Sequence, residues 1–306
     1  MDASEFGDRE ALMAYLWERR NWERWAAAPE LGTLNLVSAA KRAEAAALVR
    51  VGDVLSLSLP ISTRPSKRNP EPLHQRGRRI RPSADMQGIA DYIGIDYHGY
   101  SVTHIDALCH VWTDHGMWGG HDPEVVLSTE LERRLGGVDA WSAGIVTRGI
   151  LVDIPRLRDV PWVDLDSPVT AGELEAACDS VGLKVDTGDA LAIYMGRDAW
   201  EAEHPGWSGY SDPRPGLDAS CLRFFRDHDL AAVIWDFSDA RPNRYQMHWT
   251  VHLAIPYFGL AVIDNASLGA LASRCQLLLR HEFLLLVAPL VVAGGAGSPV
   301  NPLVVF

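Results

Sequence analysis

Cysteine is scarce in this sequence, and its spacing excludes several kinds of site. The 306 residues include four cysteines, Cys109, Cys178, Cys221 and Cys275. No two of them form a C-x-x-C pair, which excludes a zinc ribbon and a thioredoxin-like redox motif. We expect four reduced thiols that lie in the core.

Long hydrophobic runs are also missing. The most apolar stretch, Phe283 to Val292, has about half of the roughly 20 residues that a membrane-spanning helix needs, and it contains Pro289. The first thirty residues lack the apolar segment of a signal peptide. The sequence therefore predicts a cytoplasmic protein with no membrane partner.

Positive charge is in deficit. Lys and Arg number 28 against 40 Asp and Glu, which gives a net charge of −12. Phosphate backbones would be repelled on average, and the one basic stretch, Arg64 to Arg81, is short and interrupted by proline. We therefore expect no nucleic-acid partner. Hydrophobic residues make up 47% of the chain, so a sizeable core can form.

Apolar periodicity predicts a single α/β domain, with helices packed on a mixed sheet. A period of two indicates a strand at 55–59, and short apolar runs indicate further strands at 92–97, 101–108, 145–154, 190–195, 231–237, 260–264 and 283–292. Helices are expected at about 8–27, 38–50, 170–182 and 218–228. Residues 64–82 contain four prolines and are expected to form a long loop.

We divide the chain into an N-terminal helical extension, residues 1–50, and a domain formed by residues 51–306. The extension is rich in tryptophan, with Trp17, Trp22 and Trp25 close together. Because aromatic side chains are enriched in interfaces, its helix is a candidate arm on a partner subunit. It could equally cover the core of its own chain.

The sequence contains eleven histidines, enough to build a metal or proton-transfer site. The most specific pattern is His104-Ile-Asp106, with His110 four residues later. Side chains two apart on a strand share a face, so His104 and Asp106 would project together, and a turn could bring His110 back to them. This donor set suits zinc or manganese. The alternative is that these are ordinary, partly buried residues that hydrogen-bond one another.

A second group lies downstream, where His248 and His252 stand four apart and Asp264 ends a short apolar run. The two histidines would share one face of a helix. An acid at the end of a strand in an α/β protein is a frequent ligand or catalytic group. The alternative assigns the histidines to a solvated helix face and Asp264 to a turn.

Together the two groups resemble the signatures of the cyclase-type metal-dependent hydrolases, which include bacterial kynurenine formamidase, isatin hydrolase and trans-dienelactone hydrolase. Thr103 to His110 resembles the first signature, H-x-G-T-H-x-D-x-P-x-H. His252 to Asn265 resembles the second, a His, a Gly seven residues on, and an acid followed by Asn. The similarity runs from about Val54 to Leu271. It implies a swivelling β/β/α fold and a homodimer or homotetramer.

The resemblance also implies roles for individual residues. It makes His104 and Asp106 metal ligands, and His110 either a ligand or the acid/base residue. His252 and Asp264 match the ligands of the second signature.

Three departures from the signatures bear on the number of ions. Tyr100 replaces the first histidine, Val102 replaces the glycine, and Asp264 is shorter than the usual glutamate. His98, two residues before Tyr100, could substitute for that histidine only if the strand is bulged. We therefore expect one divalent ion, Zn or Mn, rather than two, held by His104, Asp106 and His110.

The resemblance implies a small-molecule substrate: a cyclic amide or lactone that is opened, or an aryl formamide that is cleaved. Zinc-type ions lower the pKa of bound water to about 7 and polarise a carbonyl, so a metal-bound hydroxide would attack the substrate. His110 would carry the proton to the leaving group and Asp264 would orient the water. Tyr100 and Trp112 could stack on an aromatic substrate. The alternatives are a ring-forming cyclase and a metal-binding protein without turnover.

Overall fold

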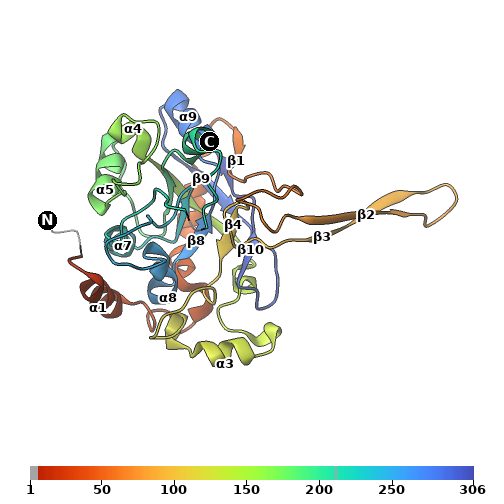
Figure 1. Ribbon diagram of the computed structural model, residues 1–306, viewed down its shortest axis with the longest axis horizontal. Helices are drawn as coiled ribbons and strands as arrows, with labels where there is room; N and C mark the ends of the chain where they lie inside the picture. Colours follow the sequence, from red (N-terminus) through yellow and green to blue (C-terminus); the bar gives the residue numbers. More distant parts are fainter. Residues whose placement is uncertain (1–5, 211) are drawn as a thin grey trace.

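A computed structural model, which describes residues 6–210 and 212–306, shows a single α/β domain built on a curled, nine-stranded mixed sheet. The strand order is β1-β11-β9-β5-β6-β7-β8-β4-β10, and helices flank the sheet (Figure 1). The strands are β1 (Val54–Ser56), β4 (His104–Asp106), β5 (Ile145–Asp153), β6 (Ala190–Tyr194), β7 (Ala232–Trp235), β8 (Ala261–Asp264), β9 (Glu282–Val287), β10 (Gly297–Pro299) and β11 (Leu303–Val305).

The centre of the sheet is parallel and its two sides are antiparallel. Strands β5 to β8 pair in parallel, and their side chains are almost all buried, as expected for apolar runs covered on both faces. Strand β4 then pairs antiparallel with β8, in a register that places His104 opposite Asp264. This one pairing brings the two histidine groups of the sequence to the same place.

The helices predicted from the sequence form close to their expected positions. Ser38 caps α2 (Ala39–Ala46), and the capping box of Thr170 and Glu173 begins α5 (Ala171–Ser180). The other helices are α1 (Arg9–Arg19), α3 (Pro123–Ser128), α4 (Ile154–Arg158), α6 (Arg197–Glu203), α7 (Cys221–Asp227), α8 (Ala254–Phe258) and α9 (Gly269–Leu278). Short 3-10 segments are η1 (Pro29–Leu36), η2 (Trp118–Gly120), η3 (Leu131–Arg133), η4 (Val138–Trp141) and η5 (Val251–Leu253).

The N-terminal helix α1 packs on its own chain. Leu12 and Leu16 are fully buried in the common core. Just after the helix, the Asn21 backbone N–H donates to the carbonyl oxygen of Tyr257 at 2.8 Å. The Trp22 indole donates to the carbonyl oxygen of Pro256 at 2.6 Å. The start of the predicted extension, residues 1–5, lies outside the described residues, and the division at residue 50 stays a prediction.

The prediction of a long loop at 64–82 is wrong for the second half of that segment. Residues of β2 (His74–Ile80) pair antiparallel with β3 (Gly88–Gly94), and the resulting hairpin projects from the body of the molecule (Figure 1). The prolines do not prevent this pairing because they flank the strand instead of interrupting it. The Arg76 guanidinium lies over the Tyr92 ring on the paired strand, 4.7 Å from its centroid, and supports the ribbon.

The environment of the cysteines and the character of the helices bear on two predictions from the sequence. All four cysteines are buried and free, which confirms the prediction of core thiols. Among the described residues, none of the helices has the length and apolar character that crossing a membrane would need.

Candidate metal centre

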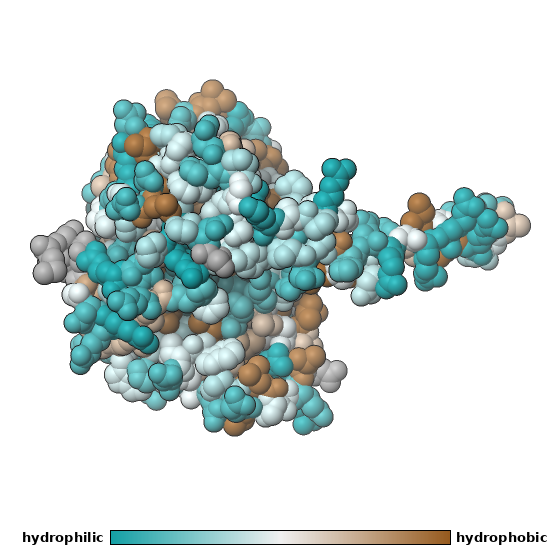
Figure 2. All heavy atoms as spheres, viewed as in Figure 1, coloured by the Kyte–Doolittle hydropathy of each residue, from teal (hydrophilic) through white to brown (hydrophobic). Residues whose placement is uncertain are grey.

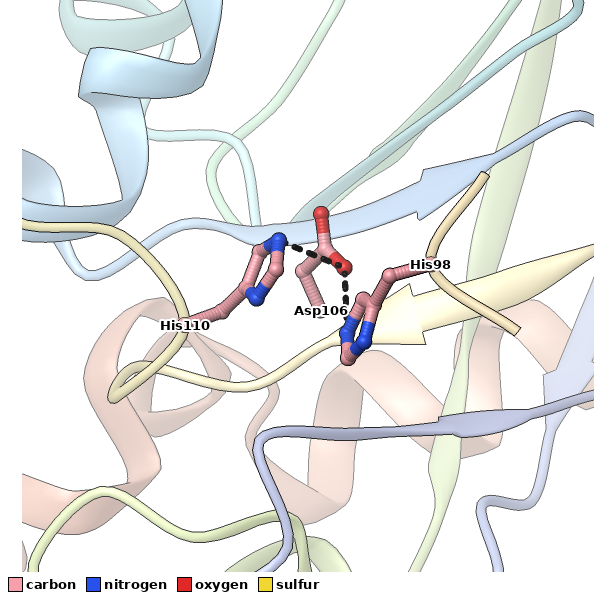
Figure 3. A group of neighbouring side chains, drawn as sticks. All are labelled: His98, Asp106 and His110. Atoms are coloured by element: carbon pink, nitrogen blue, oxygen red, sulfur yellow. Dashed lines mark ion pairs between the residues drawn. The ribbon is translucent and has the colours of Figure 1, made fainter. Parts of the chain in front are cut away.

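The carboxylate of Asp106 lies at the centre of a ring of imidazoles. Its Oδ1 is 3.4 Å from Nε2 of His98, 3.4 Å from Nε2 of His104 and 3.7 Å from Nε2 of His110. Its Oδ2 is 3.7 Å from Nε2 of His252. Asp106 is only 1% exposed, so these rings, rather than water, form its surroundings. Figure 3 shows His98 and His110 approaching the carboxylate together.

Strand β4 and the loops at its two ends position the first half of this centre. His104 and Asp106 project from the same face of β4, as their spacing predicts. A tight turn follows, in which the His110 N–H donates to the carbonyl oxygen of Ala107 at 3.0 Å, and this brings the ring of His110 back. His98 comes from the loop between β3 and β4 and stacks on His110, with ring centroids 4.0 Å apart.

The position of His98 changes an expectation from the sequence. We expected it to replace the missing histidine at Tyr100 only through a strand bulge. The strand is in fact limited to His104–Asp106, and His98 belongs to an irregular segment that can turn its ring toward Asp106. Sequence reasoning underrated this residue because it assigned a longer strand, 101–108, to the region.

Strand β8 and the segment η5 supply the second half. Asp264, at the end of β8, has Oδ2 3.3 Å from Nε2 of His252 and 3.9 Å from Nε2 of His104. The Trp235 indole donates to its other oxygen and orients the carboxylate. His248 lies outside this contact set, in an exposed bend before η5, so the expected helix face shared by the two histidines is wrong.

Asp239 holds His252 in place, and sequence reasoning missed it. Its Oδ2 accepts from Nδ1 of His252, which leaves Nε2 directed at Asp106 and Asp264. Its Oδ1 accepts from the backbone N–H groups of Thr250 and Val251. A carboxylate behind an imidazole is the usual way to orient a histidine ligand. The sequence did contain a signal for Asp239. This residue lies shortly after the end of β7, and Asp264, which the sequence did single out, lies at the end of β8.

A buried polar frame holds the loop that carries Tyr100. The Arg197 guanidinium donates to the Tyr100 carbonyl oxygen and to Oδ1 of Asn265, the latter at 2.6 Å. The Asn265 amide donates to the carbonyl oxygen of Val102 at 3.0 Å. Arg214, 1% exposed, donates to the Tyr100 hydroxyl at 2.8 Å. The loop is therefore fixed by side chains from three other segments.

The charges of the centre follow from burial and from the close rings. Burial raises the pKa of Asp106, but His110, His98 and His104 together outweigh it and hold that pKa well below its usual range. The pKa of Asp264 is lowered because His252 outweighs the effect of burial. Burial lowers the pKa of His110 and dominates over the attraction of Asp106. The centre therefore favours the ionised form of both carboxylates.

These residues fit a divalent ion. Both carboxylate oxygens of Asp106 and Nε2 of His98 are buried with no hydrogen-bond partner, an arrangement that costs free energy unless a ligand takes the lone pairs. Two donors about 2.1 Å from one zinc-type ion lie about 3.4 Å apart in a tetrahedral shell, which matches the contacts of His98 and His104 with Asp106. Two groups have mutually close ligand atoms: His98, Asp106 and His110, and His104, Asp106 and Asp264.

A cavity of about 290 Å³ opens onto the centre. Its lining includes His98, His104, His110, His252 and Asp264 together with Tyr100, Tyr210, Ser238, His248 and Trp249. This volume is near the lower end of the range of about 300–1,000 Å³ for small-molecule sites. Trp112 does not line it. Trp112 lines a neighbouring cavity of about 420 Å³ that shares the wall formed by His248 and Trp249.

Replacing His98 with alanine is expected to weaken binding of zinc or manganese by more than about 100-fold, since loss of a residue that only supports a ligand already costs about 10–100-fold. The change removes a ring that faces Asp106 at 3.4 Å. Titration with a competing chelator measures the affinity. His121→Ala, an exposed histidine outside the contacts of Asp106, is the matched control and should bind as the parent does. Unchanged affinity in His98→Ala would remove His98 from the ligand set.

The comparisons with known proteins agree with the fold. A sequence model of the cyclase family, described as "Putative cyclase", matches residues 55–240. A crystal structure of a novel cyclase superposes with a TM-score of 0.82 at 25% identity, over 94% of this chain and 99% of that one. No curated protein sequence matches the chain significantly.

Two more distant structures share the fold. One is a predicted metal-dependent hydrolase from Bacillus stearothermophilus, with a TM-score of 0.52 at 15% identity, over 83% of this chain and 98% of that one. The other is isatin hydrolase A from Ralstonia solanacearum, with a TM-score of 0.51 at 17% identity, over 82% of this chain and 91% of that one. The family match spans more than half of the sequence, and the chain therefore belongs to the cyclase family.

Proposed function

We propose that this protein is a metal-dependent hydrolase that opens a small cyclic amide or lactone, or cleaves an aryl formamide. The observation that carries the proposal is the carboxylate of Asp106, which is buried, without a hydrogen-bond partner and surrounded by four imidazoles that line a small cavity. Two proteins of similar fold, a predicted metal-dependent hydrolase and isatin hydrolase A, support the same class of reaction.

We place a divalent ion, Zn or Mn, beside Asp106. Such an ion lowers the pKa of water and polarises a carbonyl oxygen, which is the chemistry that amide or ester hydrolysis needs. Both candidate ligand groups contain Asp106, so a second ion would have to share its carboxylate. We therefore expect one equivalent per chain, with His98, His104 and His110 as the imidazoles nearest to Oδ1.

The chain itself supplies proton transfer and substrate orientation. Where His98, His104 and Asp106 hold the ion, the ring of His110 lines the cavity and is free to accept a proton from the attacking water and return it to the leaving group, and burial lowers its pKa, which favours the neutral ring that this role needs. Asp264 is held by the Trp235 indole and accepts a hydrogen bond from that water. Arg214 donates to the Tyr100 oxygen, which leaves the Tyr100 proton available to a substrate carbonyl in the cavity.

The test is hydrolysis in water enriched in oxygen-18. After reconstitution with Zn or Mn, the protein is offered lactones, cyclic amides and aryl formamides, and the products are analysed by mass spectrometry. Hydrolysis adds one molecule of water, so one heavy oxygen is expected in the carboxylate that forms. Asp96→Asn, an exposed acid outside the cavity lining, serves as the active control.

Two results would contradict the proposal. A ring-forming cyclase would release product without incorporating solvent oxygen, and the family name makes this the second candidate. A protein that binds one ion tightly and turns over no member of the panel would be a metal-binding protein without hydrolytic activity on these classes.

A further inference from the structure

A second cavity lies beside the one that opens onto the metal centre. Its volume is about 420 Å³, and His248 and Trp249 line both cavities, so this short segment forms the wall between them. The Trp249 ring centroid lies 6.4 Å from that of His110 and 5.9 Å from that of His252. Trp249 therefore stands between the second cavity and two of the imidazoles that surround Asp106.

Apolar and aromatic side chains form most of the lining of the second cavity. They are Met13, Val111, Trp112, Met247, Trp249 and Leu253. On the face of the molecule that Figure 2 shows, most of the surface is hydrophilic, and the apolar side chains form small separate groups. A hollow lined by apolar and aromatic side chains with few polar groups is typical of a small-molecule site.

The charged groups of the second cavity balance each other. Its lining contains one guanidinium, that of Arg9, and one carboxylate, that of Asp114, and both side chains are exposed. One positive and one negative group cancel at a distance, so the cavity attracts neither cations nor anions strongly. The group that fits this surface is uncharged and apolar.

The N-terminal helix α1 supplies one side of this cavity. Met13 is partly buried and packs against the core, while its helix neighbours Leu12 and Leu16 are fully buried. Arg9 lies four residues before Met13 and therefore shares its face of the helix. The helix is thus fixed on the body of the molecule, and it presents this face to the cavity.

The other sides come from the segments that carry two histidines of the metal centre. Residues 111–115 follow His110 directly, and residues 247–249 come shortly before His252. A group bound in the second cavity therefore contacts the same two segments that hold His110 and His252 beside Asp106.

The volumes of the two cavities suggest a division of roles. The first, at about 290 Å³, is slightly smaller than the range of about 300–1,000 Å³ for small-molecule sites, whereas the two together lie inside that range. The first cavity has room for the bond that reacts and its immediate neighbours. The rest of a larger substrate needs the second cavity.

We infer that the second cavity is a subsite for an uncharged aryl substituent of the substrate, and that Trp249 separates this substituent from the bond that is hydrolysed. The inference rests on the proposed function, because it narrows the substrate class of the same site to amides, lactones or aryl formamides that carry such a substituent. The aryl ring contacts the Trp112 indole and the Met13 thioether, both of which interact favourably with aromatic rings.

The experiment compares formanilide with 4-benzylformanilide as substrates of the reconstituted full chain. The subsite variant carries Met13→Ala and Trp112→Ala. The control, Leu277→Ala, shortens an exposed side chain of α9 outside both cavities. For the parent and the control, kcat/KM should be about 10–100-fold higher for the benzyl compound, the effect of burying one aromatic ring. In the subsite variant this ratio should fall at least tenfold, through a higher KM for the benzyl compound.

Binding without turnover provides a second measurement. The product amines, aniline and 4-benzylaniline, contain no bond that the enzyme hydrolyses, and calorimetry measures their dissociation constants. The parent and the control should bind 4-benzylaniline about 10–100-fold more tightly than aniline. The subsite variant should lose most of this difference. Circular dichroism checks that each variant is folded.

A separate variant, Trp249→Ala, tests the wall between the cavities. The methylene of 4-benzylformanilide lets its outer ring turn past the Trp249 indole, whereas the outer ring of 4-phenylformanilide is held in line with the inner one. The parent should therefore prefer the benzyl to the phenyl compound in kcat/KM. Trp249→Ala should reduce this preference at least threefold, and an unchanged preference would show that Trp249 does not separate the two cavities for the substrate.

The outcomes distinguish the subsite from the proposed hydrolysis. Equal affinity of the parent for the two amines, a subsite variant that keeps the preference, or a control that loses it would overturn the inference. Hydrolysis of both formanilides at equal kcat/KM would also overturn it and leave the proposed function standing. A preference for 4-benzylaniline that the subsite variant loses, with no hydrolysis of any substrate, would support the subsite and contradict the proposed function.

Discussion

Replacing Asp106 with asparagine is expected to abolish tight binding of the divalent ion and to lower hydrolytic activity by more than about 1,000-fold. Loss of the ion removes several kcal/mol of stabilisation from the transition state, and each 1.4 kcal/mol is about tenfold in rate. Asp106 is the residue that the rings of His98, His104, His110 and His252 share. Asparagine keeps its shape and removes the charge that attracts the cation.

The same substitution should lower the stability of the metal-free fold near neutral pH. The pKa of Asp106 is held well below its usual range in the folded chain, so its ionised carboxylate stabilises the fold, and a neutral side chain loses that contribution. Saturating zinc or manganese should raise the free energy of unfolding of the parent, by about 2.7 kcal/mol at a hundred times the dissociation constant. The variant should gain nothing.

Elemental analysis, urea unfolding with and without metal, and the hydrolysis assay check this prediction, with Asp96→Asn as the matched substitution. An Asp106→Asn protein that retains a full equivalent of metal would show that the ion lies elsewhere. A variant that fails to fold in chelator would show that the carboxylate is needed for structure rather than for binding the ion.

Replacing Asp239 with asparagine is expected to destabilise the fold by about 3–5 kcal/mol, the range for removing one partner of a buried ion pair. One carboxylate oxygen of Asp239 accepts from two backbone N–H groups and the other from Nδ1 of His252. An asparagine has one oxygen only, so its NH₂ group must face either the backbone donors or the imidazole N–H. Urea unfolding measures the loss. Asp139→Asn, a partly buried acid that accepts from the Gly294 N–H, is the control.

Asp239→Asn should also change the pH dependence of metal binding. Burial lowers the pKa of His252, but Asp239 and Asp264 outweigh burial and raise that pKa well above its usual value. A proton therefore competes with the cation for this ring, and the affinity for metal falls as the pH drops through the raised pKa. Without the charge of Asp239 the pKa of His252 falls, so fewer protons are released on binding at neutral pH. Calorimetry in buffers of different ionisation enthalpy counts them, and an unchanged count would limit Asp239 to a structural role.

Much of the fold follows from local signals in the sequence. The Thr170 and Glu173 capping box, the Ser38 cap and the apolar runs of β5 to β8 lie where periodicity predicts them. These features depend on residues a few positions apart, which is why they can be read without a structure. The hairpin was not predicted from the sequence because its strands are charged and exposed, and neither property marks a strand that packs on a core.

The sequence predicted the kinds of side chain in the candidate site, but it did not predict all of the residues that form it. His104 and Asp106 share a face because they are two residues apart on a strand. His98 and Asp239 join the site through the path of loops, which carries no period.

By itself, therefore, the sequence determined most of the elements of the core, where most of them begin, and which histidine and aspartate residues are candidates for a metal site. The tertiary structure alone decided the register of β4 on β8, which sets His104 opposite Asp264, and the turn of His98 toward Asp106. It also decided that the basic segment extends outward as a ribbon. The physical reason is that helix caps and strand periods are local, whereas strand pairing and the approach of loops depend on contacts between segments far apart in the chain.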